Sequence, residues 1–301
     1  MTTNSPSPSN TQTIVLDRRG GCFRWALLPI FLLSLMMNCA WLGTVTPSVP
    51  HRLTENYYAG PFTAKAKVAI VEVTGLIMDG SAEHAIKQLK QAREDDAVKA
   101  VVMRVDSPGG TVSGSDRIWR EVELLVRGTD KKGTNRKPVV VSMGGTAASG
   151  GYYVSAPADV IFAEPTTMTG SIGVIMEIPQ LHKLMEKVGV EFATITTGEF
   201  KDMGSMYRPM TPSEQARWRE TIDVAYQRFV RIVAEGRKLE LAPTLALANG
   251  KVYTAKEARD LKLVDHLGYL DDAIEEAQRR AKVNEVKVVK YARSLGLEGL
   301  L

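Results

Sequence analysis

The chain has 301 residues, of which 44% are hydrophobic and 24% are charged, so a globular protein of one large or two small domains is expected. The formal net charge is only +4, which gives no electrostatic reason to expect a nucleic-acid-binding protein. Both cysteines, Cys22 and Cys39, lie within the first 45 residues, so the rest of the chain can form neither a disulfide framework nor a cysteine-based metal site.

Near the N-terminus, a polar tail is followed by a long apolar run. Residues 1–24 are rich in Ser, Thr, Asn and Pro and end in basic residues, which predicts a disordered cytoplasmic tail. Residues 25–45 carry no charge over 21 positions, and as a helix they would span roughly 30 Å, about the hydrocarbon thickness of a bilayer. Because basic residues favour the cytoplasmic side, the pattern predicts an uncleaved single-pass transmembrane anchor with the rest of the chain exported.

The apolar run has two alternative interpretations. A cleaved signal peptide would have a shorter apolar core followed by a site with small residues, and this sequence has neither feature. A lipoprotein anchor at Cys39 would need small residues before the cysteine, whereas Met37 and Asn38 stand there. We therefore expect residues 25–45 to remain part of the protein.

Beyond the apolar run, a linker precedes an alternation of strand and helix patterns. Residues 46–62 contain three prolines and little periodicity, which predicts the linker, and residues 63–301 form the folded domain. The predicted strands are 67–73, 99–105, 138–143, 160–163, 191–196 and 285–291, and the predicted helices are 82–93, 113–127, one that begins near Ser149, 179–188, 211–238 and 271–282. This alternation predicts an α/β fold with a largely parallel, helix-covered sheet. Thr211 and Glu214 open the longest helix with a capping-box pattern.

A cluster of small residues around Ser149 is the strongest candidate site. A strand-like run at 138–143 breaks into glycines, and Ser149 falls at or just inside the start of the next helix. Free backbone N–H groups at such a position favour a developing negative charge, and flanking glycines let a substrate approach closely. The pattern is equally compatible with two elements that simply pack tightly.

No histidine stands in a recognisable catalytic setting. His51 is placed in the linker, His84 and His182 in helices, and His266 in a loop. The sequence also lacks a zinc-binding HExxH motif and a Walker loop, so we expect neither a metal nor another cofactor.

A lysine can replace histidine as the base in serine hydrolysis. It must then lose its proton near neutral pH, which requires its pKa to fall by about 3 units from the ordinary value of about 10.4. The candidate is Lys201, which lies between a predicted strand and a proline-bearing turn. Its neighbours Glu199 and Asp202 would keep it charged, so they are expected to point away from it.

A second glycine pair, Gly109-Gly110, follows the strand predicted at 99–105 and precedes a helix. Backbone N–H groups at such a position can hold an oxyanion. They fit a phosphate-binding turn or a plain turn equally well.

Three segments in this order resemble the signal peptide peptidase SppA family: Val105-Asp-Ser-Pro-Gly-Gly, Gly145-Thr-Ala-Ala-Ser-Gly-Gly-Tyr-Tyr and Gly198-Glu-Phe-Lys-Asp. Thr169-Gly-Ser-Ile-Gly and parts of 253–268 are similar to the family as well. The likeness covers roughly residues 65–290 and is closest to a single-repeat member with an N-terminal anchor.

The resemblance implies a Clp-protease/crotonase-like fold with repeated ββα units, and it implies a role for five residues. Ser149 matches the nucleophile and Lys201 the general base, which in single-repeat members comes from a neighbouring subunit of a ring-like oligomer. Ser171 matches a serine that positions the lysine. Gly110 matches a glycine whose N–H helps to form the oxyanion hole, with the N–H of Gly150 as a second donor.

The activity implied by the resemblance is that of a membrane-anchored serine endopeptidase in the bacterial inner membrane. Its expected substrates are remnant signal peptides and other hydrophobic peptides, and its expected partners are the membrane and further copies of the chain in a ring-like homo-oligomer. One alternative is a crotonase-like acyl-CoA enzyme, which shares the fold but needs no serine–lysine pair. Another is a non-catalytic membrane scaffold of protease ancestry.

Overall fold

The computed structural model describes residues 53–129 and 135–292, together with Ser34 and Met36. The chain divides into two units, Met1–His51 and Arg52–Leu301. Apart from Ser34 and Met36, the predicted tail and anchor of the first unit lie outside the described residues. Within the described ranges, no helix is both long and apolar enough to cross a membrane.

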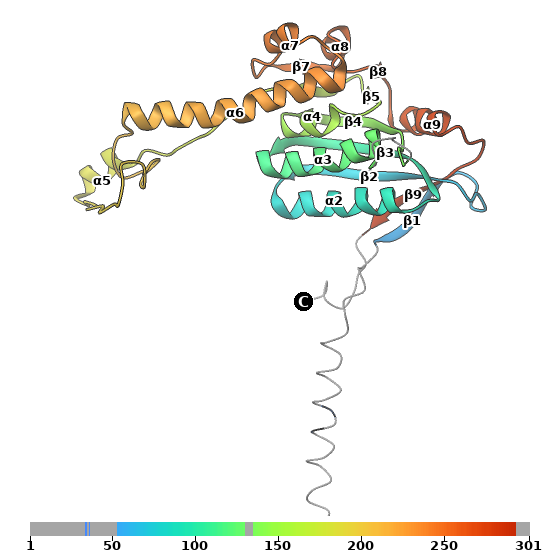
Figure 1. Ribbon diagram of the computed structural model, residues 1–301, viewed down its shortest axis with the longest axis horizontal. Helices are drawn as coiled ribbons and strands as arrows, with labels where there is room; N and C mark the ends of the chain where they lie inside the picture. Colours follow the sequence, from blue (N-terminus) through green and yellow to red (C-terminus); the bar gives the residue numbers. More distant parts are fainter. Residues whose placement is uncertain (1–33, 35, 37–52, 130–134, 293–301) are drawn as a thin grey trace, which may run out of the picture. The chain divides into compact units, whose positions relative to one another are not determined.

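A nine-stranded sheet runs through the second unit (Figure 1). The strands are β1 (Thr54–Ala59), β2 (Lys67–Ile77), β3 (Val98–Gly110), β4 (Val139–Ala148), β5 (Val160–Ala163), β6 (Met168–Gly170), β7 (Val252–Thr254), β8 (His266–Leu267) and β9 (Lys287–Ala292). The main path is β1-β9-β2-β3-β4-β5-β8, and β6 pairs with the end of β4 and with β7. Only β1 and β7 pair antiparallel with their neighbours, which confirms the largely parallel sheet.

Helices cover both faces of this sheet. They include α2 (Asp79–Glu94), α3 (Val112–Arg127), α4 (Gly150–Ser155) and α9 (Leu270–Ala281). Along β3, Met103 and Val105 belong to the core cluster that also holds residues of α2, α3 and α4, whereas Ala100 and Val102 belong to the cluster under α9. This alternation is the two-residue period of a strand, and burial on both faces explains the nearly continuous apolar runs of the sequence.

Two strands extend beyond their predicted ends into the glycine segments. The strand predicted at 99–105 continues to Gly110, because β2 runs beside it and pairs Leu76 with Gly109 and Ile77 with Gly110. The strand predicted at 138–143 continues to Ala148, where its last residues pair with β6. The Gly109-Gly110 pair is therefore the end of a strand, and the two glycine segments lie on neighbouring strands.

Several predictions about minor elements are wrong. Residues 191–196 form no strand, and they are exposed with no neighbouring strand to pair with. The predicted linker contains β1, which pairs with β9 at the sheet edge, and His266 lies in the short β8 rather than in a loop. Two short helices, α7 (Leu241–Leu247) and α8 (Ala255–Asp260), were not anticipated.

The longest helix, α6 (Pro212–Arg237), begins with the predicted capping box. Thr211 Oγ1 accepts a hydrogen bond from the N–H of Glu214 at 3.2 Å, and the Glu214 carboxylate accepts one from the N–H of Thr211 at 2.9 Å. Figure 1 shows that the first half of α6 extends past the sheet and meets the segment around α5 (His182–Val188). We refer to residues 178–211 as the tip.

Candidate active site

Ser149 lies where β4 ends and α4 begins. Its backbone has φ 51° and ψ −118°, a conformation that non-glycine residues rarely adopt. Its N–H donates to the carbonyl of Gly170 at 2.8 Å, and its own carbonyl accepts from the N–H of Tyr153 at 2.9 Å. Ser149 is the N-cap of α4, but its side chain makes no capping hydrogen bond, so the hydroxyl is not used to stabilise the helix. Strain of this kind is typical of functional residues.

The glycines of β3 and α4 bring two backbone segments into contact around this serine. A Cβ on Gly109 would lie 2.6 Å from the nitrogen of Gly150 and 2.9 Å from Cβ of Ser149, so a side chain does not fit there. A Cβ on Gly150 would in turn lie 3.2 Å from the nitrogen of Gly110. The two predicted oxyanion donors, Gly110 and Gly150, therefore lie side by side next to Ser149.

Asp106 and Ser107, which no sequence pattern singled out, hold the two glycine segments in place around Ser149. Ser107 Oγ donates to the carbonyl of Gly75 at 2.6 Å and accepts from the N–H of Gly109 at 3.1 Å. Asp106 Oδ1 accepts from the N–H of Thr146 at 3.0 Å, which ties β3 to β4 just before the serine. The N–H of Gly109 is thus already engaged, which favours Gly110 as the oxyanion donor of this pair. Asp106 and Ser107 belong to the Val-Asp-Ser-Pro-Gly-Gly segment, so their polar side chains beside glycines were the available signal.

Ser171 lies beside Ser149 in the sheet, and its role in positioning the lysine stays a prediction. The parallel pairing of Ala148 with Gly170 places the two serines at the same level of neighbouring strand ends. Ser171 also has a positive φ, 49°, and its N–H donates to the carbonyl of Lys251 at 2.8 Å. Two serines in strained backbone conformations therefore meet at the carboxyl edge of the sheet.

Lys201 lies in the tip, on a different part of the chain from Ser149. Its side chain is exposed and makes no hydrogen bond or ion pair with any residue that the structure describes. The segment around α5 lies at the end of α6 away from α4 (Figure 1), and the structure records no hydrogen bond between Lys201 and Ser149 among the residues that it describes.

The carboxylates beside Lys201 are turned to other partners, as expected. Asp202 accepts two hydrogen bonds from Arg208, at 2.7 and 2.8 Å, and Glu199 accepts one from Ser213 Oγ at 3.1 Å. The Arg208 guanidinium also pairs with Glu214 and holds the pKa of that carboxyl well below its usual range, at about 2. These bonds leave Lys201 without an acidic partner in the tip.

Exposed apolar side chains stand on the strand ends that flank Ser149. They lie on β2, at the starts of α2 and α3, and on β6, and they are Leu76, Met78, Val112 and Met168. Leu76 pairs with Gly109, and Met168 pairs with Thr146, so both lie on segments adjoining the serine. No local sequence pattern marks these residues, because strand-end positions cannot be recognised without the sheet pairing.

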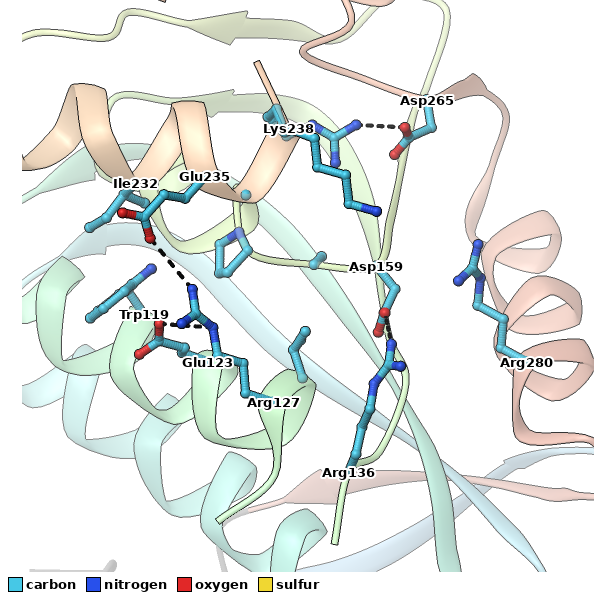
Figure 2. Close-up of a pocket in the computed structure, with 15 residues that line it drawn as sticks. Trp119, Glu123, Arg127, Arg136, Asp159, Ile232, Glu235, Lys238, Asp265 and Arg280 are labelled. Carbon is cyan, nitrogen blue, oxygen red and sulfur yellow. Dashed lines mark hydrogen bonds and ion pairs between the residues drawn. The ribbon is translucent and has the colours of Figure 1, made fainter. Parts of the chain in front are cut away.

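A cavity of about 430 Å³ lies elsewhere, between the ends of α3 and α6 and the α4–β5 connection (Figure 2). Most of its charged side chains form ion pairs within the lining: Arg127 with Glu123 and Glu235, Arg136 with Asp159, and Arg237 with Asp265. Ser149, Ser171 and Lys201 are not among the residues that line it. This cavity is a junction of ion pairs that fixes the C-terminal end of α6, and it is separate from the candidate active site.

Comparison with known proteins agrees with this geometry. The model of peptidase family S49 matches residues 131–284, and the model of the Clp protease family matches residues 58–197. The protein named "Putative protease MJ0651" from Methanocaldococcus jannaschii is 41% identical over 221 residues, which cover 73% of this chain and 68% of that protein.

Two bacterial relatives carry more specific names. Protease 4 from Salmonella typhi is 37% identical over 232 residues, 75% of this chain and 36% of the relative. The protein named "Putative signal peptide peptidase SppA" from Enterococcus faecium is 37% identical over 209 residues, 69% of this chain and 59% of the relative. The chain therefore belongs to peptidase family S49 and is a protease of mixed α/β fold with a Clp-protease-like domain.

Proposed function

We propose that the protein is a serine endopeptidase in which Ser149 is the nucleophile and Lys201 of a neighbouring subunit is the general base. One observation carries the proposal: in a member of peptidase family S49, Ser149 is held in a strained turn against Gly109 and Gly150. No other serine that the structure describes combines such a turn with two glycine segments packed against its backbone.

The reaction follows from the arrangement at the strand ends. The neutral amine of Lys201 takes the proton of the Ser149 hydroxyl as the oxygen attacks the scissile carbonyl carbon. The N–H groups of Gly110 and Gly150 stabilise the negative charge that develops on the carbonyl oxygen. Lys201 then returns the proton to the leaving amine, and a water molecule hydrolyses the acyl-enzyme. Ser171, beside Ser149, orients the incoming amine.

The surface of the tip supports a shared site. Large apolar side chains are exposed on the tip and the chain leading to it: Ile175 (85%), Val188 (65%), Phe192 (56%), Ile195 (98%) and Phe200 (46%). So many large apolar side chains exposed along one segment favour a site of interaction with another protein surface. A second copy that covers the tip would exclude water around Lys201, and loss of water favours the neutral amine that the reaction needs.

The substrate class follows from the apolar residues beside the serine. Leu76, Met78, Val112 and Met168 offer exposed apolar contacts at the strand ends, which favours hydrophobic peptides such as remnant signal peptides. The uncharged residues 25–45 support an anchor that would hold the peptidase domain at the outer side of a bacterial inner membrane, near such peptides.

Two single substitutions test the chemistry in the detergent-solubilised full-length protein. Ser149→Ala and Lys201→Ala should each lower kcat for a fluorogenic hydrophobic peptide by about 10⁴-fold or more, because each removes one half of the reacting pair. Lys183→Ala, an exposed lysine of the same tip, is the matched control and should keep full activity. A fluorophosphonate probe should label Ser149 alone, as mapped by mass spectrometry.

A mixture of the two inactive chains tests whether the dyad is shared. Co-assembled Ser149→Ala and Lys201→Ala chains should regain activity, since some interfaces then combine an intact serine with an intact lysine. Wild-type turnover by a folded Ser149→Ala protein would exclude the nucleophile, and a permanently silent mixture would exclude sharing between subunits.

A further inference from the structure

The two halves of α6 have different surroundings. From residue 229 onward the helix packs into the core through a series of buried side chains: Phe229, Val230, Ile232, Val233 and Ala234. In residues 212–227 the only buried side chain is that of Glu214, which bonds within the tip. The first half of α6 is therefore an arm that joins the tip to the body of the domain.

Arg228 stands at the point where this arm leaves the body. Its Nε donates to Asp116 Oδ1 of α3 at 2.7 Å, and its guanidinium lies over the ring of Trp119 at 4.8 Å. The same Asp116 oxygen accepts a hydrogen bond from the hydroxyl of Tyr153 at 2.6 Å. We call Arg228, Asp116 and Tyr153 the junction clamp, because they connect three helices at one carboxylate oxygen.

The clamp reaches the backbone of the nucleophile. Tyr153 belongs to α4, it is 4% exposed, and its N–H donates to the carbonyl of Ser149 at 2.9 Å. Its ring packs against Phe229 of α6 at 4.9 Å. The origin of the arm is thus fixed directly to the helix that begins at Ser149.

The length of the arm amplifies small changes at its origin. Residues 212–227 are 16 helical residues, which span about 24 Å at 1.5 Å per residue. A tilt of about 5° at Arg228 would displace the far end by about 2 Å, and a misplacement of about 1 Å can lower the rate of an enzymatic step by about 10²-fold.

We infer that Arg228, through Asp116, is a positioning residue that sets the direction of the α6 arm and so places Lys201 at the Ser149 of the neighbouring subunit. The inference rests on the shared dyad of the proposed function. Arg228 itself touches neither substrate nor reacting atoms. A residue that acts through the arm has its effect in the chain that supplies the lysine, whereas an effect carried through Tyr153 to Ser149 would arise in the chain that supplies the serine.

Mixed assemblies separate these two roles. Two inactive chains, Ser149→Ala and Lys201→Ala, are co-expressed with different tags and purified as the mixed oligomer. Arg228→Gln is then added either to the Ser149→Ala chain, which supplies the lysine, or to the Lys201→Ala chain, which supplies the serine. Arg231→Gln, an exposed arginine on the same helix without a partner among the described residues, is the matched control.

The expected result is asymmetric. Arg228→Gln in the lysine-supplying chain should lower the kcat of the mixture at least 10-fold and leave KM within about 2-fold, because substrate binding is untouched. The same substitution in the serine-supplying chain, and Arg231→Gln in either, should change kcat less than 2-fold. Arg228→Lys, which keeps the charge beside Asp116, should restore part of the lost activity.

Three results would overturn the inference. An equal loss in both placements would mean that Arg228 supports the fold or the nucleophile, which thermal unfolding and the size of the assembly would also reveal. No loss in either placement would mean that the arm is directed without the clamp. A mixture that is inactive before Arg228 is changed would refute the shared dyad itself, and the inference would fall with it.

Discussion

Substitution of Arg208 tests most directly whether ion pairs hold the tip together as a local unit. It joins Asp202, the residue next to Lys201, to Glu214 at the start of α6. The Glu214 side chain is only 2% exposed, and Asp202 is 19% exposed. Arg208→Gln removes the positive charge between two carboxylates and leaves a buried one without a cationic partner.

The structure predicts that Arg208→Gln lowers the stability of the tip strongly and that of the body little. The Glu214 side chain is nearly buried, so removing its cationic partner leaves a charge without compensation. Because Arg208 itself is one third exposed and water screens the pair, the open population of the tip should rise by about 10-fold. Within residues 212–227, the contacts with the core are confined to Tyr226 at the end nearest the body, so this opening should stay local and leave the unfolding temperature of the body nearly unchanged.

Hydrogen exchange measured by mass spectrometry resolves the two regions. Peptides that cover residues 198–214 should exchange about 10-fold faster in Arg208→Gln, whereas peptides from β3 and β4 should exchange as in the wild type. Peptidase activity should fall in parallel, because Lys201 lies in the loosened segment.

The control for this experiment is Arg217→Gln. Arg217 pairs with Glu220 on the exposed face of α6, where both side chains are more than 60% exposed, and such a pair contributes at most about 0.5 kcal/mol. Unchanged exchange in the tip of Arg208→Gln, or equally fast exchange throughout the body, would refute the view that the tip is a local unit held by Arg208.

Three further predictions concern the strained turn, the glycine frame and the acid stability of the tip. The Ser149→Gly variant should unfold about 2–4 °C above the Ser149→Ala variant. Glycine relieves backbone strain of about 1–3 kcal/mol at φ 51°, and its greater chain entropy in the unfolded state offsets less than about 1 kcal/mol of that gain. Calorimetry of the two variants measures the difference. Gly109→Ala should lower kcat/KM by 10²-fold or more, since its Cβ would lie 2.6 Å from the nitrogen of Gly150, and wild-type kinetics would contradict this packing. Because the pKa of Glu214 is lowered to about 2, its ion pair contributes fully to the stability of the tip above about pH 4.5, and this contribution is lost as the pH falls toward 2. The fluorescence of Trp218, in a variant that lacks the other tryptophans, should change across that window and stay constant above it.

Much of the fold was predictable because its signals are local. The apolar runs of β3 and β4 and the capping box at Thr211 and Glu214 each identified an element from adjacent residues. The wrong predictions involve pairing between distant segments. The edge strand β1 depends on β9, which lies about 230 residues later, and residues 191–196 have a strand-like composition but pair with no strand that the structure describes.

The same distinction applies to the site. The glycine segments marked Ser149 and Gly110 in the sequence, and the structure brings them together through Gly109 and Gly150. The proximity of Ser171 to Ser149 follows from the pairing of β6 with β4, which local pattern does not specify. The junction at Asp116 joins three helices far apart in sequence, so no local pattern marks it.

Around Ser149, backbone groups and exposed side chains have separate expected roles, and this separation affects how such a protease can evolve. The groups expected to bind the oxyanion are backbone N–H groups, and the close packing of Gly109 and Gly150 leaves no room for a side chain at either position. The residues suited to contact a peptide, Leu76, Met78 and Met168 among them, are exposed and replaceable. Substrate preference can therefore diverge by ordinary point mutation while the reaction chemistry stays constant.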